Sequence, residues 1–365
     1  MTNHICKISD STKYKFPYET FGHAGFNKIH NRNNFLYQCK NSFLIYRKDV
    51  TLKKKLDKLF FSNKYTSSRF SSHVDSKNIG KKNISHYVSI AEIIKKYINS
   101  KSQKVLEVGC YDGKLLNELS KKFKKSEFYG YDVSTSIKKL FKKNCKFNFV
   151  DNLDSLQKKF DLIICVNTFQ YVPNFSDLTK NMKRLLSSKG KIFFLNTFLD
   201  KYPFMINYGD QYNYITENSF KNFLRFHKLD GKIITNSVEF PRNLIGVFEH
   251  SNKKYKFLKS KKVSFYLKYL EKIENKLNKI TSDEVNIFGS TINAKFLFEK
   301  LKQRIKKITF VDENPHKINK KFFGKKIIHP SKLKNNSLVL MPYGPTNKQI
   351  INKLNKRYKL RYLEL

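Results

Sequence analysis

The pattern of apolar and polar positions predicts alternating strands and helices over most of the chain. An apolar run at 105–108 ends in a turn bracketed by Gly109 and Gly113, and a helical pattern starts directly afterwards. α/β proteins place nucleotide-like ligands at such turns, because small residues let the backbone approach and the helix N-terminus offers unpaired N–H groups. Tyr111 in the middle of the E-x-G-x-x-x-G spacing disfavours a pyrophosphate lying across the loop.

An acidic residue follows at a distance typical of ribose binding. The run 128–131 leads to Asp132, nineteen residues after Gly113, and this carboxylate can accept hydrogen bonds from both ribose hydroxyls. Two further predicted strands end at Asp151 and Asn167, and residues 191–196 form another. Residues 86–98 read as an amphipathic helix that packs on the sheet.

This ordered set resembles the class I S-adenosylmethionine-dependent methyltransferases, which have an α/β, Rossmann-like fold. The resemblance implies that Glu107 and Asp132 bind polar groups of S-adenosylmethionine. It also implies that Asp151 lies near the adenine edge and Asn167 at the methionyl end. The candidate cofactor-binding residues are Glu107, Gly109, Cys110, Asp112, Gly113, Asp132, Asp151 and Asn167.

The chain also resembles the three-part sugar C-methyltransferases. Residues 167–174 fall on a family segment N-x-F-x-H-V-P-D, with Tyr171 in place of the histidine. Residues 208–216 fall on Y-H-E-H-x-S-Y-x-S, where Asp210 stands for the glutamate and Gln211 for the histidine that the family uses as general base. Tyr65 matches a tyrosine that reaches the substrate pocket in the family. The candidate catalytic residues are Asp210, Tyr208, Tyr65, Gln211 and Tyr171.

The loss of the base histidine leaves the acceptor atom open. Methylation of a sugar carbon requires removal of a proton beside a carbonyl, and Gln211 cannot accept that proton. Asp210 could do so if burial raised its pKa. Transfer to oxygen or nitrogen depends less on a general base, because the sulfonium is an activated methyl donor and positioning of the acceptor supplies much of the rate. The acceptor implied by the resemblance is a nucleotide-linked sugar or a saccharide precursor. An inactive, cofactor-binding scaffold is the alternative.

The N-terminal segment, 1–60, resembles a degenerate zinc ribbon. Cys6 and Cys39 each begin a knuckle in which serine replaces the second cysteine. A serine hydroxyl is a poor substitute for a thiolate, so we expect no zinc and regard the two cysteines as remnants of a site. His4, His23 or His30 would be needed to complete one.

The C-terminal segment, 281–365, reads as a second, smaller Rossmann-like domain. The run V-D-E-N-P-H-K at 311–317 matches the sugar C-methyltransferase family, in which this domain helps to hold the nucleotide end of the substrate. A structural lobe without a ligand is the alternative, and the turn at Gly289 lacks the glycines of a NAD site. The predicted organisation is completed by a methyltransferase domain over 61–250 and a basic helical connector over 251–280, with its helical pattern at 255–279.

Composition changes this picture little. The formal net charge is +44, but lysines are spread over the whole chain of 365 residues, which favours a solvated basic surface over a nucleic-acid site. An RNA methyltransferase therefore ranks last, although anionic substrates should be attracted. Five cysteines without a signal peptide favour a reducing compartment, and no apolar run approaches a membrane span, so we expect a cytoplasmic protein.

Overall fold

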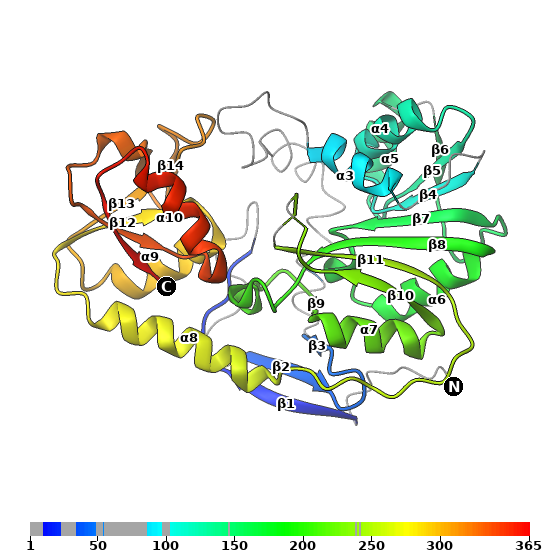
Figure 1. Cartoon of the computed structure of the whole chain (residues 1–365), viewed down its shortest axis with the longest axis horizontal. Helices are drawn as coiled ribbons and strands as arrows, with labels where there is room; N and C mark the ends of the chain where they lie inside the picture. Colours follow the sequence, from blue (N-terminus) through cyan, green and yellow to red (C-terminus); the bar gives the residue numbers. More distant parts are fainter. Residues whose placement is uncertain are drawn as a thin grey trace. The chain divides into compact units, whose positions relative to one another are not determined.

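The computed structural model describes residues 10–22, 34–48, 54, 86–96, 103–144, 147–237, 239–240 and 242–365 (Figure 1). The chain divides into two compact units that interleave along the sequence. Unit 1 comprises Met1–Lys13, Tyr37–Phe198 and Gln211–Lys261, and unit 2 comprises Tyr14–Leu36, Leu199–Asp210 and Lys262–Leu365.

Unit 1 is built on a seven-stranded sheet of order β10-β11-β8-β7-β4-β5-β6. The five strands from β8 to β6 are parallel, whereas β11 pairs antiparallel with β8 and with β10. The predicted strands are all present, and β8 is longer than expected. The bounds are β4 Lys104–Val108, β5 Glu127–Tyr131, β6 Asn148–Val150, β7 Phe160–Val166, β8 Leu186–Thr197, β10 Leu229–Ile234 and β11 Asn243–His250.

Helices cover both faces of this sheet because alternate strand residues point to opposite sides. Leu106 and Ile163 join one core cluster with residues of α6 and α7. Val105 and Leu162 join the other cluster with residues of α3, α4 and α5. Figure 1 shows the two sets of helices on opposite sides of the strands. The bounds are α3 His86–Lys95, α4 Lys114–Lys122, α5 Thr135–Asn144, η3 Phe169–Tyr171, α6 Phe175–Leu185 and α7 Glu217–Phe226.

A second, small sheet has the order β1-β2-β3-β9. Within it, β3 pairs antiparallel with both β2 and β9. Aromatic rings pack here: Tyr37 stacks on Tyr46 with ring centroids 5.6 Å apart. The bounds are β1 Ser11–Phe16, β2 Asn34–Cys39, β3 Ile45–Tyr46 and β9 Asn213–Tyr214.

Unit 2 contains a six-stranded sheet of order β14-β15-β13-β12-β16-β17. The strands from β15 to β17 are parallel, and β14 pairs antiparallel with β15. This is the second α/β domain that the sequence predicted. The bounds are β12 Glu284–Phe288, β13 Lys307–Val311, β14 Lys321–Phe322, β15 Lys325–Ile328, β16 Leu338–Met341 and β17 Arg361–Glu364.

The basic helix before this sheet is shorter than predicted and belongs to unit 2. It begins at Val263, whereas the helical pattern was predicted from residue 255, and the preceding Phe257 is 43% exposed. Tyr266, Leu270 and Ile273 are buried, as the helical spacing predicted. The bounds are α8 Val263–Asn278, α9 Ile292–Leu301, α10 Asn347–Asn355, η4 Pro203–Asn207, η5 Pro330–Lys332 and η6 Gly344–Thr346.

The two compact units cut across the predicted domain boundaries. Residues 14–36 fall in unit 2, although the sequence placed them in an N-terminal ribbon, and residues 199–210 leave the methyltransferase segment to join the same unit. The second of these segments includes η4, which contacts α8 within unit 2. Among the described residues, no helix is long and apolar enough to cross a membrane.

Candidate active site

The strand order of unit 1 reverses at the carboxyl ends of β4 and β7. From β4 the chain runs to β5 and β6 on one side of the sheet, and then returns to β7 and β8 on the other side. Such a reversal of strand order is where open α/β sheets bind ligands. The turn predicted at Gly109 follows β4, so the sequence-predicted cofactor loop lies at this reversal point.

Gly109 is required by two features of this turn. Its φ is +80°, in the left-handed region that favours glycine. A Cβ at this position would lie 2.1 Å from Oγ1 of Thr168, in the segment that follows β7. The N–H groups of Gly109 and Cys110 both donate to the carbonyl of Tyr131, at 2.7 and 3.0 Å. The loop is therefore held between the ends of three neighbouring strands.

Asp132 lies at the carboxyl end of β5 and points toward the loop. Its Oδ2 accepts the backbone N–H of Tyr111 at 3.2 Å, and its Oδ1 accepts that of Ser134 at 3.1 Å. Burial raises the pKa of Asp132 above its ordinary value, while these N–H bonds lower it. Each carboxylate oxygen has two lone pairs, so Asp132 can still accept ribose hydroxyls.

Glu107 is a buried acid in the middle of β4. It is 4% exposed, and its Oε2 has no hydrogen-bond partner. Burial, followed by the nearby charges of Asp112 and Asp132, raises the pKa of Glu107 well above its ordinary value. A buried carboxyl group without a partner beside two other acids fits a cationic ligand. The ammonium and sulfonium groups of S-adenosylmethionine are cations of this kind.

The remaining candidate cofactor-binding residues lie in the same loop or just beyond β6. Asp112 forms a 2.7 Å ion pair with Lys114, and Gly113 caps α4 with φ +72°. Cys110 is buried. Asp151 lies just beyond β6 with its side chain 65% exposed, and it pairs with Lys138 at 2.5 Å.

Asn167 and Tyr171 lie together just beyond β7. Asn167 has a φ of +49° and donates its backbone N–H to Leu195 of β8 at 2.7 Å. Its Oδ1 has no hydrogen-bond partner. Tyr171 ends η3, and its N–H donates to the carbonyl of Thr168, which ties it to the same segment.

Buried amides line this edge of unit 1, and the sequence analysis missed two of them. Asn196, near the end of β8, is 1% exposed, and neither amide atom has a hydrogen-bond partner. Gln170 and Gln211 are also buried, each with an unpartnered Oε1. A hydrogen bond from the N–H of Tyr212 to the carbonyl of Gln170 joins the two segments. Neutral donors and acceptors of this kind suit an uncharged polar group of an acceptor.

The predicted catalytic residues divide between the two units. Gln211 and Tyr171 belong to unit 1, whereas Tyr208 and Asp210 belong to unit 2. Within unit 2, the hydroxyl of Tyr208 donates to that of Tyr202 at 3.0 Å. Asp210 is fully buried and interacts electrostatically with Lys295, which is 8% exposed. Tyr65 lies outside the described residues.

Of the two proposed remnants of a zinc site, Cys39 lies in the described part of the chain. Cys39 is fully buried at the end of β2, and its Sγ accepts the N–H of Ser42 at 3.4 Å. Cys6, His4, His23 and His30 lie outside the described part of the chain. Among the residues that are described, no group of three or more histidine, cysteine or acidic side chains could hold a metal ion.

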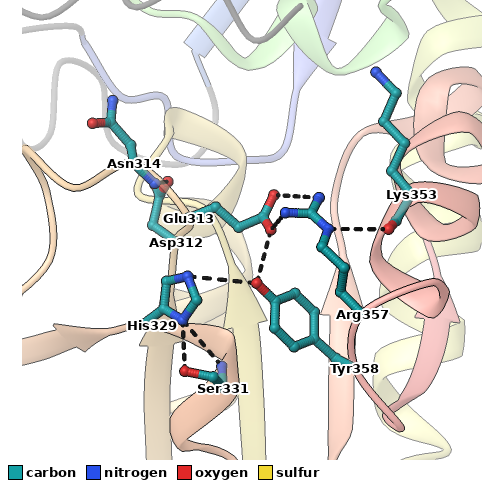
Figure 2. A network of polar contacts seen from close by, with 8 residues as sticks. All are labelled: Asp312, Glu313, Asn314, His329, Ser331, Lys353, Arg357 and Tyr358. Atoms are coloured by element: carbon teal, nitrogen blue, oxygen red, sulfur yellow. Dashed lines mark hydrogen bonds and ion pairs between the residues drawn. The ribbon is translucent and has the colours of Figure 1, made fainter. Parts of the chain in front are cut away.

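The corresponding edge of unit 2 is occupied by its own side chains. The hydroxyl of Tyr343 lies 1.9 Å from where a Cβ would be at Gly289, so the tyrosine covers the turn after β12. Beyond β13, Asp312 pairs with Lys317 at 3.2 Å. Figure 2 shows the adjacent network, in which Glu313 binds Arg357 at 2.6 Å and accepts the hydroxyl of Tyr358 at 3.0 Å.

Comparisons with known proteins agree with the fold of unit 1. Residues 83–230 match the methyltransferase domain family. The malonyl-[acyl-carrier protein] O-methyltransferase of Bacillus cereus is 31% identical over 113 residues, which are 29% of this chain and 42% of the relative. The enzyme of the same name from Calditerrivibrio nitroreducens is 27% identical over 167 residues, 44% of this chain and 66% of the relative. The chain thus spans less than two thirds of either relative.

The chain is also similar, at TM-scores below 0.5, to solved structures of methyltransferases. The plantazolicin methyltransferase BpumL, solved with SAH, is 17% identical and covers 55% of this chain and 99% of its own, with a TM-score of 0.41. The magnesium protoporphyrin IX methyltransferase of Synechocystis, also solved with SAH, is 16% identical and covers 45% of this chain and 82% of its own, with a TM-score of 0.38. The family match and the strand order identify residues 83–230 as a methyltransferase domain with a Rossmann-like α/β fold.

Proposed function

We propose that this protein transfers a methyl group from S-adenosylmethionine to an oxygen or nitrogen atom of a nucleotide-linked sugar or saccharide precursor. The observation that carries the proposal is the loop at the end of β4. It is fixed by Asp132 through the N–H of Tyr111 and lies beside the unpartnered carboxyl group of Glu107. In this proposal Asp132 binds the ribose hydroxyls, and Glu107 faces the cationic methionyl end of the cofactor.

Buried amides near the end of β8 and just before β9 support an acceptor that is held by neutral hydrogen bonds. Asn196 and Gln211 are buried and offer unpartnered polar atoms. Neither can take a proton from carbon, which supports transfer to a heteroatom over carbon methylation. The acceptor oxygen or nitrogen attacks the methyl carbon, the carbon–sulfur bond breaks with its electrons going to sulfur, and the acceptor proton leaves to a base or to water. The two curated relatives carry O-methyltransferase names, which also supports transfer to oxygen.

The nucleotide-sugar part of the proposal rests on the resemblance of residues 208–216 and 311–317 to the sugar C-methyltransferases. The same resemblance proposes Tyr208, Asp210 and Tyr65 as residues that face the acceptor. Asp210→Asn tests this role: turnover should fall while cofactor affinity stays unchanged. Unchanged turnover would exclude Asp210 as the base.

Calorimetry tests whether the cofactor binds, and a methyl-labelling assay tests which acceptor is methylated. S-adenosylmethionine titrated into the full chain should bind one site per chain. Methyl-labelled cofactor would then be offered with uridine and thymidine diphosphate sugars and, in parallel, with malonyl-acyl carrier protein. Labelled sugar product supports the proposal. Labelled malonyl-acyl carrier protein would show that the acceptor is not a sugar. Absence of cofactor binding at millimolar ligand would overturn the methyltransferase assignment.

A further inference from the structure

A basic pocket lies in unit 1 at the edge of the sheet opposite to the cofactor loop. It has a volume of about 980 Å³, near the upper end of the size range of small-molecule sites. Its lining includes Leu186 at the start of β8, which pairs with Phe160 at the start of β7. The strands are parallel, so the cofactor loop lies beyond their other ends, roughly 20 Å away at about 3.3 Å per residue.

The lining of this pocket is cationic and contains no carboxylate. Three of its cations have partners within the protein: Lys159 donates to the carbonyl of Arg184, Arg184 donates to that of Leu156 at 2.6 Å, and Lys180 pairs with Asp177 at 3.1 Å. The lining residues are Lys159, Lys180, Lys183, Arg184, Leu186, Ser187, Ser188, Phe226, His227, Lys228 and His250.

Two lysines in the pocket differ from these three. Neither the ammonium of Lys183 nor that of Lys228 has a hydrogen bond or ion pair within the described part of the chain. Burial, followed by the charge of Lys228, lowers the pKa of Lys183. Two cations brought together without an acid repel each other, and an anion between them would remove that cost.

The backbone and the apolar part of the pocket add to this argument. Lys228 has a φ of +58°, in the left-handed region where glycine would be less strained. Lys228 follows His227, the C-cap residue of α7, and a left-handed residue at this position is a common way for a helix to end. Phe226 is 40% exposed beside it, although large apolar side chains are more often buried. An exposed ring next to paired cations suits a ligand with an aromatic base and a charged tail.

We propose that this pocket is a second binding site, for a nucleoside diphosphate, in which Lys183 and Lys228 hold the diphosphate and Phe226 contacts the base. Its position at the opposite edge of the sheet separates it from the methyl-transfer site. The proposal therefore does not depend on which acceptor is methylated, nor on whether methyl transfer occurs.

The test uses the full chain and calorimetric titration with inorganic pyrophosphate, then with uridine diphosphate. Lys183→Gln/Lys228→Gln should weaken pyrophosphate binding by about tenfold or more. The control Lys124→Gln/Lys139→Gln removes the same charge from two exposed lysines outside the pocket and should change affinity less than about twofold. Lys183→Arg/Lys228→Arg should retain binding. S-adenosylhomocysteine affinity should be the same in all variants.

The variant Phe226→Leu tests the proposed contact between Phe226 and the base of the nucleoside diphosphate. It should weaken uridine diphosphate binding and leave pyrophosphate binding unchanged. Equal loss of pyrophosphate affinity in the pocket variant and the control variant would show diffuse attraction to a basic surface and overturn the site. Unchanged pyrophosphate affinity in the pocket variant would overturn it as well. Equal affinities of Phe226→Leu and the unmodified protein for uridine diphosphate would refute the contact with the base.

Discussion

The carboxylate of Asp132 accepts the backbone N–H of Tyr111 at 3.2 Å, across the gap between the ends of β5 and β4. Tyr111 has a φ of +46°, a conformation that is uncommon for a residue with a side chain. The hydrogen bond holds this conformation from a neighbouring strand. One side chain therefore both shapes the loop and lies where the proposed cofactor ribose would be bound.

Asp132→Ala should weaken S-adenosylhomocysteine binding strongly. The change removes the acceptor of two backbone N–H groups, and a hydrogen bond to a charged group contributes about 1.5–3 kcal/mol, or roughly 10- to 150-fold in affinity. Asp132→Asn should have a smaller effect because the amide oxygen still accepts one N–H. Calorimetric titration measures both. Asp283→Ala, at an exposed carboxylate in unit 2, serves as the control and should bind normally. Equal affinities in all three variants would contradict a role for Asp132.

Cofactor affinity should rise with pH through the raised pKa of Glu107. In the free protein this carboxyl group holds its proton above the ordinary value of 4.5, and only the deprotonated form attracts a cationic ligand. S-adenosylmethionine binding should therefore release a proton in that range. Titration in buffers of different ionisation enthalpy would detect the proton, and Glu107→Gln should abolish both effects. A pH-independent affinity in the unmodified protein would be incompatible with this role.

The same group predicts how the stability of the ligand-free protein depends on pH. The folded state binds more protons than the unfolded state between 4.5 and the raised pKa of Glu107. Its free energy of unfolding should therefore fall as pH rises through this window. Urea unfolding at about pH 5 and about pH 8 measures this, and Glu107→Gln should show a smaller fall. A fall as steep in the variant would assign the effect to other groups.

Gly109→Ala should destabilise unit 1 and abolish cofactor binding. The new Cβ would meet Thr168 at 2.1 Å in addition to a positive φ. Gly324→Ala is the matched control, because Gly324 has a φ of +72° with nothing within 4 Å of its Cβ position. The control should lose about 1–2 kcal/mol from backbone strain alone, and Gly109→Ala about 1–3 kcal/mol more. Denaturant unfolding compares the two, and equal losses would show that Thr168 moves aside freely.

Glu313→Ala should destabilise unit 2. Glu313 binds both Arg357 and Tyr358 and so links the end of β13 to the segment after α10 (Figure 2). Its removal leaves a partly buried guanidinium and a hydroxyl without this acceptor, at a cost of about 1–3 kcal/mol. Glu299→Ala breaks a surface ion pair with Lys302 and should cost less than about 1 kcal/mol. Urea unfolding provides the comparison, and equal costs would indicate that the network is a surface feature.

Local sequence predicted the strand, turn and helix around Gly109 because their features are local. Each feature depends on a few neighbouring residues: the apolar run before Gly109, the glycines of the turn and the acid at Asp132. The pairing of β4 with β5 then places them together. The C-terminal sheet was predictable for the same reason. Its strands are short apolar runs that end in turns.

Features that depend on distant pairing were not predictable. Asn196 is a candidate acceptor-binding residue only because β8 pairs with β7 and buries an amide that lacks a partner. The helical pattern before Val263 gave no sign that Phe257 stays exposed. The inclusion of residues 14–36 and 199–210 in unit 2 depends on tertiary contacts that no short sequence pattern reports. The lining of the basic pocket likewise comes from α6, α7, β8, β11 and the loops beside them.

A crystal structure of the full chain with S-adenosylhomocysteine would test the central claim most directly. We predict that the ribose hydroxyls lie within hydrogen-bond distance of Asp132, with the amino group toward Glu107 and the sulfur facing the amides after β7 and β8. Adenosine bound elsewhere, or a loop in which the side chain of Tyr111 fills the space above Gly109, would contradict the assignment of this edge as the methyl-transfer site.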